Sequence, residues 1–279
     1  PDEYVKWFLP IAKQCQRVLA PTGSMIINIK EKVVKGQRHR YVLHLIDALV
    51  ERQGWLWTEE YIWFKKNSMP GKWPNRFRDA WERCLHFTKQ PKFHMYQEAV
   101  RQERGDWADK RLANPHSTDS ERRESATKSG FGVKVANWAN RDTVYPHNVL
   151  HLAPEARNVG HSAAFPISLP AWFIKLFSAE GDIVLDPFSG SGSTGVAAVN
   201  LHRNYIGVEL HQEHARDSLR RISQADSEAE SLNDAEDLGT ETMDEQETSF
   251  QSLFVRALEP PPEELEQGTP SEETGDPDA

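Results

Sequence analysis

The chain has 279 residues, of which 38% are hydrophobic and 27% are charged, so it can bury one large core or two modest ones. Its two cysteines, Cys15 and Cys84, exclude a disulfide scaffold, and no stretch reaches the ~18 unbroken apolar residues of a membrane span. Because no secretory leader is recognisable, we expect a cytoplasmic protein. The sequence begins at Pro1 instead of Met, and we expect its natural start to lie upstream.

The formal net charge of −9 is distributed unevenly. Residues 225–279 hold 18 acidic side chains and one basic side chain, Arg256, which leaves residues 1–224 with a net charge of +8. A basic folded part suits an anionic partner such as nucleic acid. The acidic stretch is poor in aromatic residues, which predicts a disordered tail over 225–279. Its apolar run 250–255 is either a chance feature or a short motif that docks on a partner.

Hydrophobic periodicity predicts two helices and three strands in the first 90 residues. In chain order they are a helix over 4–18, a strand over 24–29, a helix from Val42 that ends at Gly54, and strands over 55–64 and 81–88. Periodicity is lost between 91 and 146, where charges mix with Gly, Asn and Ser. Long loops or a small insertion are therefore expected there.

Helices and strands alternate in the remaining folded part. They are a helix over 167–177, a strand over 183–186, a helix over 192–202, a strand over 205–209 and a helix over 211–222. This alternation predicts an α/β fold with a mostly parallel sheet and helices on both faces.

A glycine-rich loop follows the predicted strand 183–186. It runs Asp186-Pro187-Phe188-Ser189-Gly190-Ser191-Gly192-Ser193-Thr194, and Glu209 ends the next predicted strand. Glycines let a ligand approach the backbone at the carboxyl edge of a sheet, and a carboxylate placed like Glu209 can accept both hydroxyls of a ribose. The pattern therefore predicts a site for a nucleoside cofactor.

Two kinds of cofactor fit this loop. Gly190, Gly192 and Gly195 satisfy G-x-G-x-x-G, which is also found in nicotinamide and flavin dinucleotide sites of oxidoreductases. An anionic Asp186 would repel a pyrophosphate at the helix N-terminus, whereas it suits the ammonium and sulfonium groups of S-adenosylmethionine. We therefore favour S-adenosylmethionine.

The loop resembles the D-P-F-x-G-S-G-T-T motif of the DNA amino-methyltransferases, which methylate adenine N6 or cytosine N4, with Ser193 replacing the first Thr. Residues 160–170 are similar to the H-x-A-x-F-P-x-x-L-P stretch of that family, and the order of the two halves resembles its permuted β group. The resemblance implies a Rossmann-like methyltransferase fold with an irregular target-recognition insertion. It also implies cofactor contacts from Asp186, Pro187, Phe188, Gly190, Gly192, Thr194, Glu209, His161 and Phe165.

The resemblance further implies how the chain is divided and what it does. Residues 1–90 would be the catalytic half, 91–150 a target-recognition region, 151–224 the cofactor half and 225–279 the tail. The expected activity is site-specific methylation of double-stranded DNA, in restriction-modification or phage DNA protection, with a cognate restriction endonuclease as a possible partner. The alternatives are a non-catalytic DNA-binding module and a dinucleotide-dependent oxidoreductase.

The family's catalytic motif is Ser, Asp or Asn followed by Pro-Pro and an aromatic residue. The only Pro-Pro pairs in the chain lie in Pro260-Pro261-Pro262, inside the acidic tail and without an aromatic residue. The catalytic residues are therefore unknown, and we expect the motif upstream of Pro1. The 279 residues alone are expected to be inactive.

Basic side chains form two clusters that are either DNA contacts or ordinary solvated loops. The DNA-contact candidates are Lys30, Lys32, Lys35, Arg38, Arg40, Lys72, Arg76 and Arg78. No metal site is expected, because His86 and His151 lie in apolar settings of the sequence.

Overall fold

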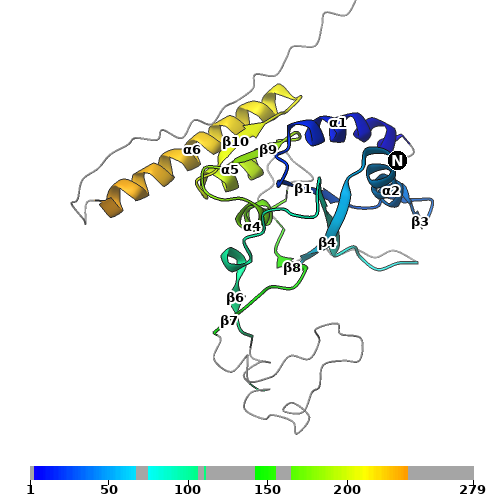
Figure 1. The fold of residues 1–279 in the computed structure, drawn as a ribbon, viewed down its shortest axis with the longest axis horizontal. Coiled ribbons are helices and arrows are strands. Elements are labelled where there is room, and N and C mark those ends of the chain that lie inside the picture. Colours follow the sequence, from blue (N-terminus) through cyan, green and yellow to red (C-terminus); the bar gives the residue numbers. More distant parts are fainter. Residues whose placement is uncertain (1–2, 67–74, 106–109, 111–141, 155–164, 238–279) are drawn as a thin grey trace, which may run out of the picture.

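The computed structural model describes residues 3–66, 75–105, 110, 142–154 and 165–237 (Figure 1). Within these ranges, no helix is both long enough and apolar enough to cross a membrane. The predicted residues His161 and Lys72 and the apolar run 250–255 lie outside the described residues.

The largest sheet has four strands in the order β1-β5-β4-β8. These are β1 (Ser24–Ile29), β5 (Trp81–Thr88), β4 (Leu56–Lys65) and β8 (Val149–Leu152). Strand β5 runs antiparallel to both β1 and β4, whereas β8 runs parallel to β4. A second, parallel sheet pairs β9 (Ile183–Asp186) with β10 (Asn204–Gly207).

The expected α/β fold is confirmed, but the strands are mixed in direction instead of mostly parallel. The reason is that β5 returns between β1 and β4 in the opposite direction. Hydrophobic periodicity encodes which face of a strand is buried, and it carries no information on strand direction. Two small antiparallel hairpins complete the described strands, β2 (Val33–Val34) with β3 (Gln37–Arg38), and β6 (Gln102–Glu103) with β7 (Thr143–Val144).

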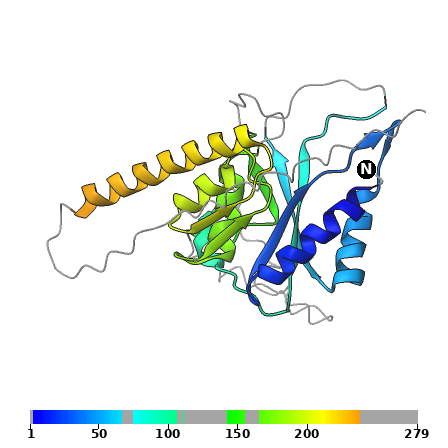
Figure 2. The same ribbon diagram turned by 90° about the horizontal axis from the view of Figure 1, so that it is seen from above.

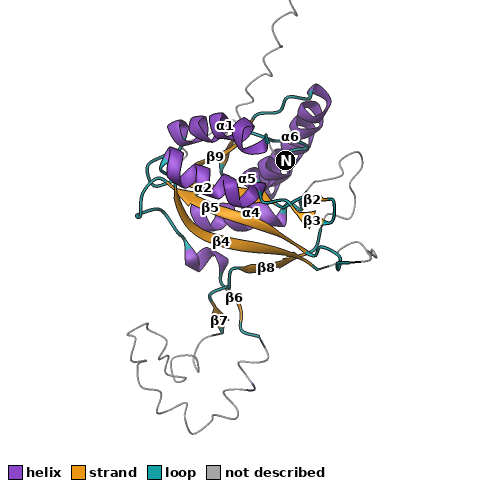
Figure 3. Cartoon of the chain, turned by 90° about the vertical axis from the view of Figure 1, so that its right-hand side faces the viewer, coloured by secondary structure: helices purple, strands orange, loops and turns teal. Residues whose placement is uncertain are grey.

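Helices cover both faces of the four-stranded sheet (Figures 2 and 3). Helices α1 (Tyr4–Val18) and α2 (Tyr41–Gln53) pack on the face that carries Leu85 and Phe87 of β5. Helix α4 (Ser168–Phe177) packs on the opposite face, where Cys84 of β5 lies. Successive residues of β5 thus point to opposite cores, as the period of a strand requires.

The β9–β10 sheet has its own apolar cluster, formed with α5 (Ser193–Val199) and α6 (Gln212–Asp237). Helix α6, which we expected to end at Ile222, continues to Asp237, so the prediction of disorder was wrong for 225–237. Residues 223–237 contain three Ala, three Glu and one Gln and no Gly or Pro, which favours a helix. Ala225 is buried against this cluster and helps to hold the extension.

The remaining boundaries shift by a few residues. Helix α5 ends at Val199, three residues earlier than predicted, and His202 then takes a positive φ of 56° in the turn to β10. Strand β10 ends at Gly207, so Glu209 lies in the loop beyond the strand. The predicted irregular region contains a short 3₁₀ helix, η1 (Gln97–Val100), and the β6–β7 hairpin, while residues 106–109 and 111–141 lie outside the described chain.

Candidate functional site

The glycine loop leaves β9 and enters α5 with its backbone held in one conformation. The backbone N–H of Ser189 donates to the carbonyl of Val208 at 2.9 Å, so the loop stays attached to the segment after β10. Gly190 and Gly192 have φ values of 51° and 83°, which L side chains rarely adopt. A Cβ on Gly192 would lie 2.4 Å from Ser218 Oγ, so this glycine also permits close packing of α6.

Gly190 differs from Gly192 in what surrounds it. The nearest atom to a Cβ built on Gly190 is the carbonyl oxygen of Phe188, at 3.9 Å. The space beside Gly190 is therefore not filled by the protein. A ligand can approach the backbone there, which is what a glycine at the mouth of a parallel strand pair allows.

Asp186 closes the loop with both carboxylate oxygens. Oδ1 accepts the backbone N–H of Phe188 at 2.9 Å, and Oδ2 accepts the hydroxyl of Thr194 at 2.6 Å. Burial raises the pKa of the Asp186 carboxyl above its ordinary value, although these two hydrogen bonds act in the opposite direction. The nearby Glu209 carboxylate raises it further. A cation bound here would relieve that unfavourable charge.

Glu209 joins the two loops that follow β9 and β10. Its Oε2 accepts the backbone N–H of Gly190 at 2.8 Å, and its Oε1 accepts the backbone N–H of His211 at 2.9 Å. The side chain is only 12% exposed, and His214 Nδ1 lies 3.8 Å from Oε1. Each carboxylate oxygen retains a further lone pair, so the group can accept two hydroxyls in a fixed orientation.

Buried polar side chains support the loop from below. The hydroxyl of Tyr205 donates to Ser189 Oγ at 2.9 Å, and Ser189 Oγ lies 3.2 Å from Ser218 Oγ. Arg221 donates to the carbonyl and the hydroxyl of Ser191 at 2.7 and 3.0 Å. Sequence reasoning missed Tyr205, Ser218 and Arg221 in this role, since no local pattern distinguishes them from other strand and helix residues.

Phe188 links the loop to the first half of the chain. Its ring centroid lies 5.7 Å from that of Trp7 and 6.3 Å from that of Phe8, both on α1. Phe188 and Trp7 remain 47% and 53% exposed. The two halves of the chain therefore meet at a partly exposed aromatic surface beside Asp186.

Phe165, predicted to cover the cofactor, packs against the core cluster between α4 and the four-stranded sheet. Its position before α4 explains this burial, because the helix carries Leu169 and Phe173 into the same cluster. Contact of Phe165 with a cofactor stays a prediction. The structure thus brings Asp186, Gly190 and Glu209 together, and it places Phe165, partly buried, against the core cluster.

These residues fit S-adenosylmethionine, on three observations. The loop has unfilled space beside Gly190, a partly buried carboxylate with an unfavourable charge at Asp186, and an oriented carboxylate at Glu209. An ammonium group, a ribose and a neighbouring sulfonium match that set. A pyrophosphate would instead meet two negative charges.

The two basic clusters of the sequence meet around a single carboxylate, that of Asp79. Arg38 Nη2 lies 2.7 Å from Oδ1, while Lys30 Nζ and Arg76 Nη1 lie 3.5 and 3.2 Å from Oδ2. Burial acts to raise the pKa of Asp79, but the hydrogen bond from Arg38 and the three positive charges outweigh it and lower that pKa. Sequence reasoning missed Asp79, although it is the only acidic residue between Lys65 and Trp81.

The loop expected after β1 is instead the β2–β3 hairpin, with Lys35 and Gly36 at its turn. Both turn residues have positive φ, 49° and 80°, as a tight two-residue hairpin turn requires. Besides Arg38, which is paired with Asp79, four candidate cations are exposed, namely Lys32, Lys35, Arg40 and Arg78. We define the basic edge as these four residues together with Lys30, Arg38 and Arg76.

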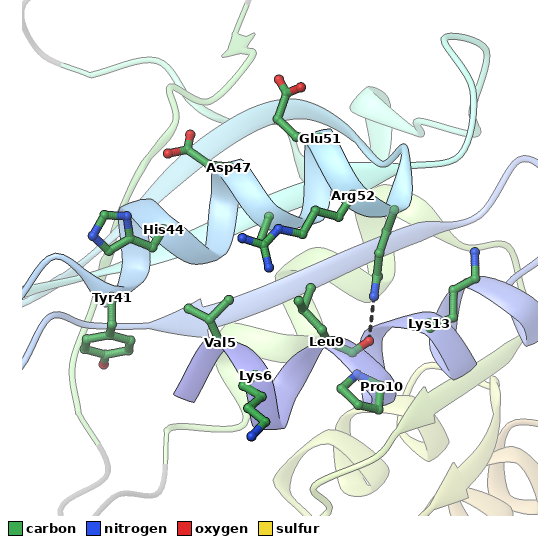
Figure 4. A pocket seen from close by; sticks show the side chains of 12 residues that line it. Val5, Lys6, Leu9, Pro10, Lys13, Tyr41, His44, Asp47, Glu51 and Arg52 are labelled. Carbon is green, nitrogen blue, oxygen red and sulfur yellow. Dashed lines mark hydrogen bonds between the residues drawn. The ribbon is translucent and has the colours of Figure 1, made fainter. Parts of the chain in front are cut away.

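A groove of about 780 Å³ lies between α1 and α2 (Figure 4). Lys6, Lys13, Asp47 and Glu51 line it with charges of both signs, and Gln53 Nε2 closes it by donating to the carbonyl of Leu9 at 2.6 Å. Its lining includes no residue of the glycine loop and not Glu209. It is therefore not the candidate cofactor site.

The histidines considered as ligands lie apart from that site. His86 is buried beside Ser24 Oγ, at 2.9 Å, and burial lowers its pKa to about 4. His151 contacts the rings of Phe64 and His147. In the part of the chain that the structure describes, no group of three or more His, Cys, Asp or Glu side chains could hold a metal ion.

Comparison with known proteins identifies the family. A DNA methylase family model, for N6 and N4 methyltransferases, matches residues 1–220. The Type II methyltransferase M.PvuII of Proteus hauseri is 26% identical over an alignment 254 residues long, which covers 83% of this chain and 74% of that protein. M.BglII of Bacillus subtilis is 24% identical over 214 residues, which are 76% of this chain and 55% of that protein.

Solved structures show the same fold. The PvuII DNA methyltransferase (cytosine-N4-specific) superposes with a TM-score of 0.59 and 22% identity, covering 82% of this chain and 77% of that one. A putative DNA modification methylase of Thermus thermophilus, solved in complex with S-adenosyl-L-methionine, gives a TM-score of 0.51 and 20% identity, covering 80% and 78%. With the family model matching most of its length, the chain belongs to the N6/N4 DNA methylase family.

Proposed function

We propose that this chain acts in the S-adenosylmethionine-dependent methylation of DNA at an exocyclic base amine, cytosine N4 or adenine N6. The observation that carries the proposal is the pair of oriented carboxylates around an unfilled glycine loop, in a chain of the N6/N4 DNA methylase family. A dinucleotide oxidoreductase is not favoured, because neither carboxylate suits a pyrophosphate.

Different residues of the site bind different groups of the cofactor. Asp186 pairs with the ammonium group of the cofactor, and Glu209 accepts the two ribose hydroxyls. The backbone at Gly190 leaves room for the chain that joins them, and Phe188 offers an apolar surface beside it. S-adenosylmethionine, when bound, supplies an activated methyl group on a sulfonium. No protein nucleophile is needed if the target amine attacks that methyl directly.

The DNA would lie against the basic edge, whose phosphate contacts place the target base near the cofactor. Reaching the amine of a paired base requires the base to leave the stack, which costs a few kcal/mol. We extend the proposal to restriction-modification, because the relatives named above are Type II methyltransferases. A cognate endonuclease and a cytoplasmic location are part of the same proposal.

Calorimetry with S-adenosylhomocysteine and with NAD tests the cofactor. We expect S-adenosylhomocysteine to bind more tightly, and tighter binding of NAD would contradict the assignment.

A labelled-methyl transfer assay on mixed-sequence DNA tests catalysis. We expect the 279 residues to bind the cofactor but to transfer no methyl group, because they hold no Ser/Asp/Asn-Pro-Pro-aromatic motif. Robust transfer would show that the catalytic residues lie within this chain, with 67–81 as the first candidate segment.

A further inference from the structure

Phe77 is the most exposed large apolar side chain of the described residues. It is 95% exposed, and it stands between Arg76 and Arg78 at the basic edge. An isolated exposed apolar residue is common on protein surfaces. A nearly fully exposed aromatic ring whose two sequence neighbours are arginines is more specific, because it combines a stacking surface with a cationic segment of the chain.

The backbone that carries Phe77 is anchored on its C-terminal side. Asp79, two residues later, forms ion pairs with Arg76, Arg38 and Lys30. Lys30 directly follows β1 and Arg38 lies in β3, so these pairs connect Asp79 to the end of β1 and to the β2–β3 hairpin. The carbonyl of Ala80 accepts the backbone N–H of Lys65 at 2.7 Å, and β5 begins at the next residue. The backbone next to Phe77 is thus held in place by contacts with several elements.

We infer that Phe77 inserts into the base stack of duplex DNA, while the basic edge around it binds the flanking phosphates. The inference rests on the proposed function, because it takes the DNA of that reaction as its partner. Apolar wedges that enter a base step and separate its bases are a known device of DNA-binding proteins. An aromatic ring gains stacking energy from any base, so the wedge requires no particular sequence.

Charge complementarity selects DNA over a protein partner. The basic edge gathers seven cationic side chains, and its acidic groups Asp79 and Glu31 are already paired with Arg38, Lys30, Arg76 or Arg83. A protein partner that buried Phe77 would need a contiguous apolar patch. Phe77 instead has charged residues on both sides in the sequence.

The test uses the full chain with S-adenosylhomocysteine bound. The probes are mixed-sequence DNA duplexes that contain 2-aminopurine, a base analogue whose fluorescence rises when it is unstacked. Phe77→Ala should weaken duplex binding about 5- to 150-fold, the range that loss of one base–aromatic stack allows. It should also abolish the fluorescence rise. Phe77→Trp should retain both signals, because it preserves the stacking surface. The salt dependence should be unchanged in every variant, since the phosphate contacts remain.

Leu43→Ala is the matched control, because Leu43 is an exposed apolar residue, 47% exposed, on α2. This variant should bind and unstack DNA like the parent chain. Thermal melting and S-adenosylhomocysteine affinity should be unchanged in all variants, which shows that each one folds.

The outcomes separate the wedge from the function on which it rests. If the parent chain binds S-adenosylhomocysteine but no duplex, the proposed DNA substrate is refuted and the wedge with it. If the parent chain binds duplexes and Phe77→Ala binds and unstacks them equally well, only the wedge is refuted. Insertion would likewise be refuted if the parent chain caused no rise in 2-aminopurine fluorescence and Phe77→Trp lost as much affinity for the duplex as Phe77→Ala.

Discussion

Replacing Glu209 with alanine would remove the carboxylate that holds the two loops after β9 and β10. The carboxylate accepts the backbone N–H groups of Gly190 and His211 at 2.8 and 2.9 Å, which leaves one lone pair on each oxygen for a ribose hydroxyl. Glu209→Ala therefore removes two predicted cofactor hydrogen bonds and two loop bonds together. The experiment must separate these two effects.

The size of the effect follows from the charge and the partial burial of Glu209. A hydrogen bond to a charged group contributes about 1.5 to 3 kcal/mol, and water replaces part of it after truncation. We expect a total loss of about 1 to 3 kcal/mol for S-adenosylhomocysteine, or roughly 5- to 150-fold in Kd.

Calorimetry with S-adenosylhomocysteine and its 2′-deoxy analogue isolates the ribose contribution. The parent chain should lose affinity for the deoxy ligand, whereas Glu209→Ala should bind both ligands equally, because the acceptor is already gone. Arg221→Ala is the control for loop order, since Arg221 holds Ser191 of the same loop without reaching Glu209 in the described contacts. That variant should still discriminate between the two ligands. Equal discrimination by the parent chain and Glu209→Ala would refute the assignment of Glu209 to the ribose.

Three further predictions concern Asp186, Gly192 and the acidic residues after α6. Because burial raises the pKa of Asp186, affinity for S-adenosylhomocysteine should fall as the pH is lowered toward and below that pKa, and Asp186→Asn should bind weakly with little pH dependence in calorimetry. The stability of the fold should depend on pH in the opposite direction. The Asp186 carboxyl stabilises the fold at pH values below its ordinary pKa, and this contribution is lost as the pH rises through the raised pKa. Gly192→Ala combines a positive φ with a 2.4 Å contact to Ser218, so thermal or urea unfolding should show a loss of about 1 to 3 kcal/mol, and an unchanged melting temperature would contradict this packing. Deleting 238–279 removes 12 acidic side chains and Arg256 but keeps α6. This deletion should leave cofactor affinity unchanged and should strengthen nonspecific DNA binding in anisotropy titrations at low salt. Equal DNA affinity with and without the segment would show that the segment does not compete with DNA.

Several features of this protein follow from local sequence alone. The period of the apolar residues located α1, α2, β1, β4 and β5 within one or two residues, because a face buried on a helix or strand recurs at a fixed interval. The loop from Asp186 to Thr194 and the acid at Glu209 were also recognisable, since their chemistry lies in short segments. Gly54 ended α2 in the left-handed conformation, as a glycine after a helical stripe predicts.

Other features were decided only by the tertiary structure. Arg38 meets Asp79 although 41 residues separate them, and Trp7 meets Phe188 across the two halves of the chain. Strand direction and the length of α6 likewise differ from expectation. The physical reason is common to all of them: apolar patterning specifies that a side chain is buried, whereas its partner depends on which distant segments pack together.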